Sequence, residues 1–169
     1  MAYYPYESGE MMTETTHNGF IIPLTILVAF ILTLLPMPSW AVWLRPAWVL
    51  MILIYWTIAA PARVNIGVAC VTGIFLDVLE GTLLGEHALA LIVVIYIVAR
   101  IYSRLRMFPL LQQGATIFLL VLLYQFILFC IQGFLGALPQ SWLYWSCSLT
   151  SMLLWPWMCS ILRRSAYAS

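Results

Sequence analysis

Three carboxylates lie inside the stretch GIFLDVLEGTLLGEHALAL, residues 73–91, which is otherwise strongly apolar. Asp77 and Glu80 are three residues apart, as in some acidic metal-binding motifs, and Glu86 is followed directly by His87. A metal site would need further carboxylates, which the other apolar segments lack. A histidine base without an adjacent nucleophile provides no catalytic mechanism. We therefore expect no enzyme activity, no metal and no cofactor, and a structural role for these side chains.

The composition indicates the kind of protein that must position these residues. Of the 169 residues, 64% are hydrophobic and 8% are charged, against roughly 25% charged residues in a soluble domain. The mean hydropathy is +1.02. This composition favours an integral membrane protein. The net charge of +1 offers no basic field for nucleic acid, and the four scattered cysteines are expected to be buried free thiols.

Six apolar segments predict an all-α integral membrane protein, a compact bundle of six transmembrane helices. Several segments are shorter than the roughly 20 residues that span a bilayer comfortably, and flanking Trp and Tyr residues with local thinning would accommodate them. We expect a flexible cytoplasmic leader at residues 1–19, one membrane domain at 20–164 and a short cytoplasmic tail at 165–169. The predicted segments are Phe20–Pro36, Pro46–Pro61, Val64–Gly81, His87–Arg104, Gly114–Gly136 and Trp142–Arg164.

The arginines predict the orientation of this bundle. Cytoplasmic loops of membrane proteins carry an excess of Lys and Arg. With both termini in the cytoplasm, Arg45 alone lies outside, whereas six arginines lie inside or at the inner boundary: Arg63, Arg100, Arg104, Arg106, Arg163 and Arg164. The two cytoplasmic termini agree with an even number of helices.

Asp77 is then the residue that most needs a partner. It lies about 21 Å along its helix from Arg63, at 1.5 Å per residue, and a carboxylate at that depth is costly unless it is paired. We expect Asp77 to face the bundle interior, held by Arg45 or, failing that, by His87. This polar clamp would fasten the outer ends of three helices. A proton or substrate relay is less favoured, because no chain of ionisable groups continues inward.

Small and polar residues recur at helical spacing in three segments. Ala69, Gly73, Asp77 and Gly81 form one stripe, which predicts close helix packing. A similar stripe at Thr25, Ala29 and Thr33 fits either an internal contact or a docking face for another membrane protein. Gln125 and Gln132 share a helix face, and we expect them to form interhelical hydrogen bonds.

Four blocks of the chain resemble the MreD family of rod shape-determining proteins. They are RPAWVLMILIYWTIAAPARVNIG (residues 45–67), GIFLDVLEGTLLGEHALAL (73–91), RMFPLLQQ (106–113) and LLWPWM (153–158). The resemblance covers nearly everything after the leader, in order. It implies a protein of the bacterial inner membrane without known catalysis. It also implies a fold similar to the substrate-binding component of energy-coupling-factor transporters.

The resemblance further implies partners. The first is MreC, a single-pass protein with a large periplasmic domain, and the others are the actin-like filament protein and the peptidoglycan synthases of the cell-elongation machinery. The loop tryptophans prefer the headgroup level, where they could brace MreC: Trp40, Trp43, Trp142 and Trp145.

The sequence therefore leaves two functions open. The first is a membrane scaffold that supports rod shape and lateral peptidoglycan synthesis. The alternative is the substrate-binding membrane component of a micronutrient transporter, which needs convergent polar groups near the outer face. The outer loops offer Trp and Leu more than hydrogen-bonding groups, so the sequence favours the scaffold.

Overall fold

A computed structural model describes residues 14–36, 38, 44–105, 107–136 and 142–167. Within these ranges the chain forms α helices and a short 3-10 helix, and no strand. The helices are α1 (Glu14–Leu34), α2 (Trp48–Ala59), α3 (Ile66–Glu80), α4 (Glu86–Leu105), α5 (Leu110–Phe134), η2 (Trp142–Trp145) and α6 (Ser146–Tyr167).

The all-helical prediction with six α helices is confirmed, and the differences lie at helix ends. Helix α1 already begins at Glu14, inside the predicted leader, and α6 continues to Tyr167, past the predicted domain boundary at residue 164. The predicted segment that begins at Trp142 opens with the 3-10 helix η2 before α6 starts at Ser146.

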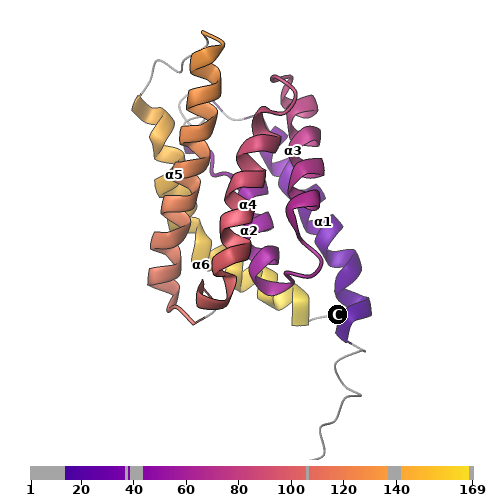
Figure 1. Cartoon of the computed structure of the whole chain (residues 1–169). Helices are drawn as coiled ribbons and strands as arrows, with labels where there is room; N and C mark the ends of the chain where they lie inside the picture. The colour runs from indigo at the N-terminus through magenta and orange to yellow at the C-terminus, as the bar shows by residue number, and fades with distance from the viewer. Residues whose placement is uncertain (1–13, 37, 39–43, 106, 137–141, 168–169) are drawn as a thin grey trace, which may run out of the picture.

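The helices alternate in direction, so their ends gather at two ends of the bundle (Figure 1). The start of α1 and the end of α6 lie at one of them. The other, which we call the Asp77 end, holds the α3–α4 turn, the start of α2, the end of α5 and the start of α6. Arg63, Arg100 and Arg104 lie at the far end, where α6 also ends with Arg163 and Arg164 in its last turns.

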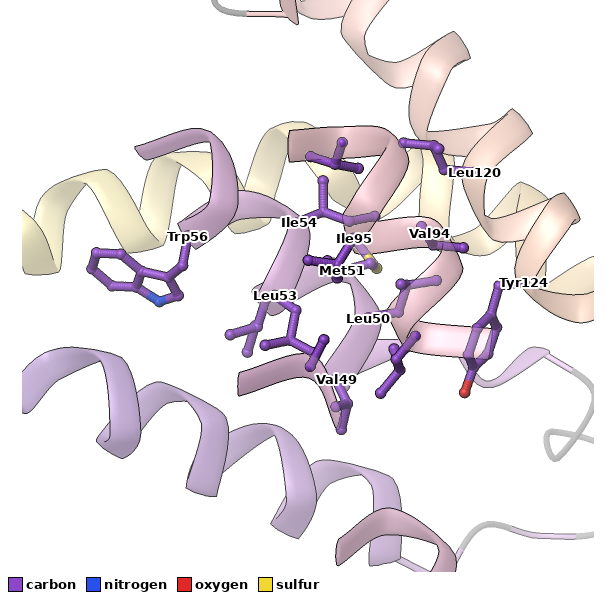
Figure 2. Close-up of a cluster of buried hydrophobic side chains, with 14 of the residues drawn as sticks. Val49, Leu50, Met51, Leu53, Ile54, Trp56, Val94, Ile95, Leu120 and Tyr124 are labelled. Atoms are coloured by element: carbon purple, nitrogen blue, oxygen red, sulfur yellow. The ribbon is translucent and has the colours of Figure 1, made fainter. Parts of the chain in front are cut away.

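Helix α2 lies at the centre of the bundle and is apolar on every side. It packs against α1, α4 and α6, and a helix that is hydrophobic all round is typical of a protein core or of a membrane span. Figure 2 shows its side chains meeting Val94 and Ile95 of α4. Pro61, just after α2, has no backbone N–H group to donate a further helical hydrogen bond, so α2 cannot continue through it. At 12 residues, α2 is about 18 Å long at 1.5 Å per residue.

Two helices are long and apolar enough to cross a membrane, namely Glu86–Leu105 and the part of α5 from Gln112 to Phe134. The shorter apolar helices that the structure describes are Phe20–Leu34, Trp48–Ala59 and Ser146–Leu162. Together with the composition, these helices indicate a membrane protein.

The stripe of small residues on α3 is a packing seam, as predicted. Ala69 and Gly73 are buried, and the backbone of Gly73 lies directly against Ala88 of α4. A methyl group built on Gly73 would stand 2.6 Å from the backbone nitrogen of Ala88 and 2.9 Å from its Cβ. Because the obstacle includes backbone, the two helices would have to move apart to admit it.

We predict that Gly73→Ala separates α3 from α4 and lowers stability by about 1–3 kcal/mol. Gly114→Ala on α5 is the matched control, because its methyl group would meet the flexible Met152 side chain at 3.8 Å, an ordinary contact. Thermal unfolding of both variants in the same detergent measures the difference. Equal melting temperatures would contradict the seam.

Candidate functional site

The carboxylate of Asp77 is fully buried and accepts four hydrogen bonds. Its Oδ1 accepts from the backbone N–H of His87 at 2.9 Å, from the His87 ring at Nδ1 at 2.8 Å and from the Thr82 hydroxyl at 3.2 Å. Its Oδ2 accepts from the backbone N–H of Gly85 at 2.7 Å. The side chain thus holds the start of α4 from the end of α3.

The local sequence explains how Asp77 reaches the next helix. Gly81 ends α3 in the left-handed conformation, with φ of 68°, and the backbone N–H groups of Gly81 and Thr82 both donate to the carbonyl of Asp77. Gly85 has φ of 101°. Glycine adopts such angles without steric cost, so the chain turns sharply and points the free N–H groups of α4 back at Asp77. A negative charge at a helix N-terminus is favourable.

His87 connects Asp77 to a second carboxylate. Its Nδ1 donates to Asp77, and its Nε2 lies 3.5 Å from the carboxylate of Glu80, which is partly exposed. The His87 ring also lies beside Tyr124 of α5, with ring centroids 6.2 Å apart. The cluster therefore ties α3 to α4 and reaches α5, and these contacts fix the position of the ring.

The expected pairing of Asp77 with Arg45 needs correction. The structure places His87, the second candidate, against Asp77, whereas the Arg45 guanidinium donates to the carbonyl of Leu35 in the α1–α2 connection. The physical reason is local, because the tight turn already supplies Asp77 with donors from within ten residues. An arginine from another helix is not needed there.

Two further polar contacts fasten α5 to its neighbours at the Asp77 end, as expected for both glutamines. Glu86 is buried, and its carboxylate accepts a hydrogen bond from the Gln132 side chain at 2.7 Å. The Gln125 amide donates to the backbone carbonyl of Tyr144 at 2.6 Å. The partner of Glu86 was not recognised from the sequence, because Gln132 lies on α5, 46 residues away.

The stripe of Thr25, Ala29 and Thr33 faces into the bundle. Ala29 has no exposed surface, and the Thr25 hydroxyl accepts a hydrogen bond from the indole N–H of Trp56 on α2 at 2.9 Å. Thr33 donates to the carbonyl of Ala29. Of the two alternatives that the sequence left open, the geometry is that of an internal contact, because α2 occupies this face.

The four tryptophans proposed to brace a partner are only partly described. Trp40, Trp43 and the side chain of Trp142 lie outside the described residues. Trp145 packs inside its own chain, with its ring centroid 6.1 Å from Phe129 and 5.7 Å from Tyr144. Its ring is therefore half-buried against α5.

A cavity of about 310 Å³ opens beside the cluster. Its lining comes from every helix of the bundle, since Thr33 represents α1 and residues near the ends of the other helices complete the wall. Sequence reasoning missed this cavity because its polar groups come from separate helices rather than from the loops. The polar and aromatic lining side chains are Thr33, Arg45, Trp48, Glu80, His87, Tyr124, Gln125, Tyr144 and Cys147.

The part of the chain that the structure describes contains no group of three His, Cys, Asp or Glu side chains arranged to hold a metal ion. The described cysteines are free thiols, but the prediction that they are buried is wrong, since Cys130 is exposed and the others are partly buried: Cys70, Cys147 and Cys159.

Comparisons with known proteins relate this geometry to a family. The family described as rod shape-determining protein MreD matches residues 13–165. The chain is 33% identical over 157 residues to a protein of Haemophilus influenzae named rod shape-determining protein MreD, covering 91% of this chain and 95% of that protein. No solved structure matches the chain.

We predict that Asp77→Ala destabilises the bundle by about 2–5 kcal/mol, because it leaves the buried N–H groups of Gly85 and His87 without an acceptor. Glu80→Ala is the matched control. It removes a partly exposed carboxylate whose contact with His87 is long, so its cost is below about 1 kcal/mol. Thermal unfolding in detergent measures both, and equal losses would argue against Asp77 as the residue that holds the turn.

Proposed function

This chain belongs to the MreD family of rod shape-determining proteins, and we propose that it is a non-catalytic membrane scaffold of the bacterial cell-elongation machinery. In this role it binds MreC and supports lateral peptidoglycan synthesis, alongside the actin-like filament protein and the peptidoglycan synthases. Family membership supports the role in rod shape. The structure adds that the buried polar side chains at the Asp77 end bond to neighbouring elements of the same chain.

The observation that supports the proposal is that the buried ionisable side chains form hydrogen bonds within the chain itself. Asp77, His87 and Glu86 each bond to a neighbouring element at the Asp77 end. Below the cavity, the cores of α2 and α4 consist of fully buried apolar side chains, so no relay of ionisable groups continues along them. These side chains are Met51, Leu53, Ile54, Leu91, Val94 and Ile95.

The outward faces of the helices supply the surfaces that a scaffold needs. They carry large apolar side chains that remain exposed in the isolated bundle, including Leu27 and Ile31 on α1, and Leu153 and Trp157 on α6. In a membrane such faces contact lipid or the transmembrane helix of a partner. We propose that the single transmembrane segment of MreC packs against one of these faces.

The alternative function, the substrate-binding membrane component of a micronutrient transporter, is supported by the cavity at the Asp77 end. We prefer the scaffold because the shape-determining relative matches over 95% of its length.

We further propose that the protein is a multi-pass protein of the inner membrane, with both termini in the cytoplasm. The support is the distribution of arginine, since Arg63, Arg100 and Arg104 lie at the end opposite Asp77, whereas Arg45 lies at the Asp77 end. Positive charge collects on the cytoplasmic side of inner-membrane proteins.

We predict that a thiol reagent that cannot cross the membrane labels Leu84→Cys, in a chain whose four cysteines are replaced by serine, from the periplasm of intact cells. Leu84 is exposed in the α3–α4 turn. Ala62→Cys is the matched control in the exposed turn at the other end, and it should react only after the membrane is opened. The reverse pattern would overturn the orientation.

We also predict that the protein restores rod shape to cells that lack their own copy and that MreC co-purifies with it. Three double-alanine variants each alter one outward helix face, and the two residues of every pair are four positions apart. The pairs are Leu27 with Ile31, Val71 with Phe75, and Leu153 with Trp157. If one face binds MreC, that pair alone loses most of the co-purified MreC and the rod shape, because large-to-alanine changes remove contact area.

The amount of protein in the membrane is the control for this comparison, since lipid-facing positions tolerate alanine without loss of accumulation. If MreC does not co-purify with the unaltered protein, MreC binding is wrong. If all three pairs leave co-purification unchanged, the contact does not involve these faces.

A further inference from the structure

The histidine ring at the start of α4 lies between two carboxylates of the last turn of α3. Its Nδ1 lies 2.8 Å from Oδ1 of Asp77, and its Nε2 lies 3.5 Å from Oε2 of Glu80. The His87 side chain is 8% exposed and the Glu80 side chain is 30% exposed. One nearly buried ring therefore joins a buried carboxylate to one that water can reach.

The Asp77 side of the ring determines which nitrogen carries the hydrogen of the neutral form. The carboxylate of Asp77 also accepts from the backbone N–H groups of Gly85 and His87, so it acts as an acceptor towards all of its neighbours. Nδ1 of His87 therefore donates to it. A neutral imidazole has one N–H group and one lone pair, so the lone pair is on Nε2 and faces Glu80.

The contact between His87 and Glu80 consequently depends on a proton. In the neutral ring, Nε2 and the carboxylate are both acceptors, and no hydrogen lies between them. In the charged ring, Nε2 gains an N–H group and the two side chains have opposite charges. Histidine is the side chain that ordinarily changes its charge between about pH 5 and pH 8. The bond to Asp77 persists in both forms, whereas the bond to Glu80 needs the charged ring.

The other ionisable groups around the ring have partners of their own or titrate elsewhere. Glu86, the preceding residue, accepts a hydrogen bond from Gln132 of α5. The guanidinium of Arg45 donates to a backbone carbonyl of the α1–α2 connection. Its charge opposes protonation of His87, but the two carboxylates in direct contact with the ring favour it. Phenol and thiol groups ordinarily titrate above about pH 8. Those that line the cavity with His87 are Tyr124 of α5, Tyr144 of η2 and Cys147 of α6.

We propose that His87 is a proton-sensitive joint between α3 and α4. The charged ring holds Asp77 and Glu80 together and fastens the end of α3 to α4 at two points. The neutral ring keeps Asp77 and releases Glu80, which frees the last residue of α3 and the part of the cavity wall that it forms.

This property goes beyond the scaffold function. In the orientation proposed above, the joint faces the periplasm and responds to the proton concentration outside the inner membrane. Its test uses the purified protein, so its failure is separate from a failure of MreC binding, of shape restoration or of the orientation.

The test compares Tm of the full chain, purified in an uncharged detergent, at about pH 6 and about pH 8. Both values lie above the range in which carboxyl groups ordinarily titrate. The charged ring has a partner in the folded chain that the unfolded chain lacks, so its stabilisation is present at the lower pH and is lost as the pH rises. Glu80→Gln keeps the shape of the side chain without its charge. It should lower Tm at the lower pH, relative to Tm at the higher pH, by about 2 °C compared with the unaltered protein.

Two further variants separate the joint from a general effect of charge. Glu86→Gln is the matched control, because it changes the neighbouring carboxylate, whose partner is Gln132. It should change Tm equally at both pH values. His87→Asn keeps a side-chain N–H group near the position of Nδ1 and lacks Nε2. It should lose the same part of the pH response as Glu80→Gln, and the double variant should lose no more than either.

An unchanged pH response in Glu80→Gln, an equal loss in Glu86→Gln, or a larger loss in the double variant would each overturn the proposal. If His87→Asn does not fold, the two glutamine variants decide, because both keep the histidine and its bond to Asp77.

Discussion

The carboxylate of Asp77 is the group on which the Asp77 end of the bundle depends. A buried negative charge is costly in an apolar medium unless hydrogen bonds satisfy it, and here the backbone N–H groups of Gly85 and His87, around the start of α4, and the ring of His87 do so. Those N–H groups in turn have no partner within their own helix. The same hydrogen bonds therefore satisfy both the buried carboxylate and these N–H groups, and they set the direction in which α4 leaves the turn.

The turn also places the seam between α3 and α4. Four residues before Asp77, Gly73 lies against Ala88, one residue after His87. The hydrogen bonds and the close approach of the backbones therefore reinforce each other over about one helical turn. Helix α4 then lies against both α2 and α5, and its placement helps to enclose the apolar core that surrounds α2 (Figure 2).

This arrangement separates the two ends of the molecule chemically. The Asp77 end contains the buried carboxylates, the fixed histidine and the cavity, whereas Arg63, Arg100 and Arg104 lie at the other end. Between them α2 and α4 contribute fully buried apolar side chains such as Leu53 and Ile95. A protein that belongs to a shape-determining family thus combines a buried apolar middle with one polar end.

The sequence by itself determined the fold class, the six helices and the need of Asp77 for a partner in the bundle interior, because these depend on local properties. Apolar run lengths, the prolines around α2 and the glycines after α3 act on their own neighbourhoods, and the small residues at Ala69 and Gly73 mark a seam whatever lies opposite. The starts and ends of the helices were less accurate, as with α1, which begins inside the predicted leader at Glu14.

Only the tertiary structure decided which groups meet across the bundle. Asp77 had two plausible partners in the sequence, and the geometry of a single turn selected His87 over Arg45. Glu86 and Gln132 are 46 residues apart, and Gln125 meets a backbone carbonyl that no sequence pattern reveals. The cavity was invisible for the same reason, because its lining residues come from all six helices and become neighbours only when the helices pack.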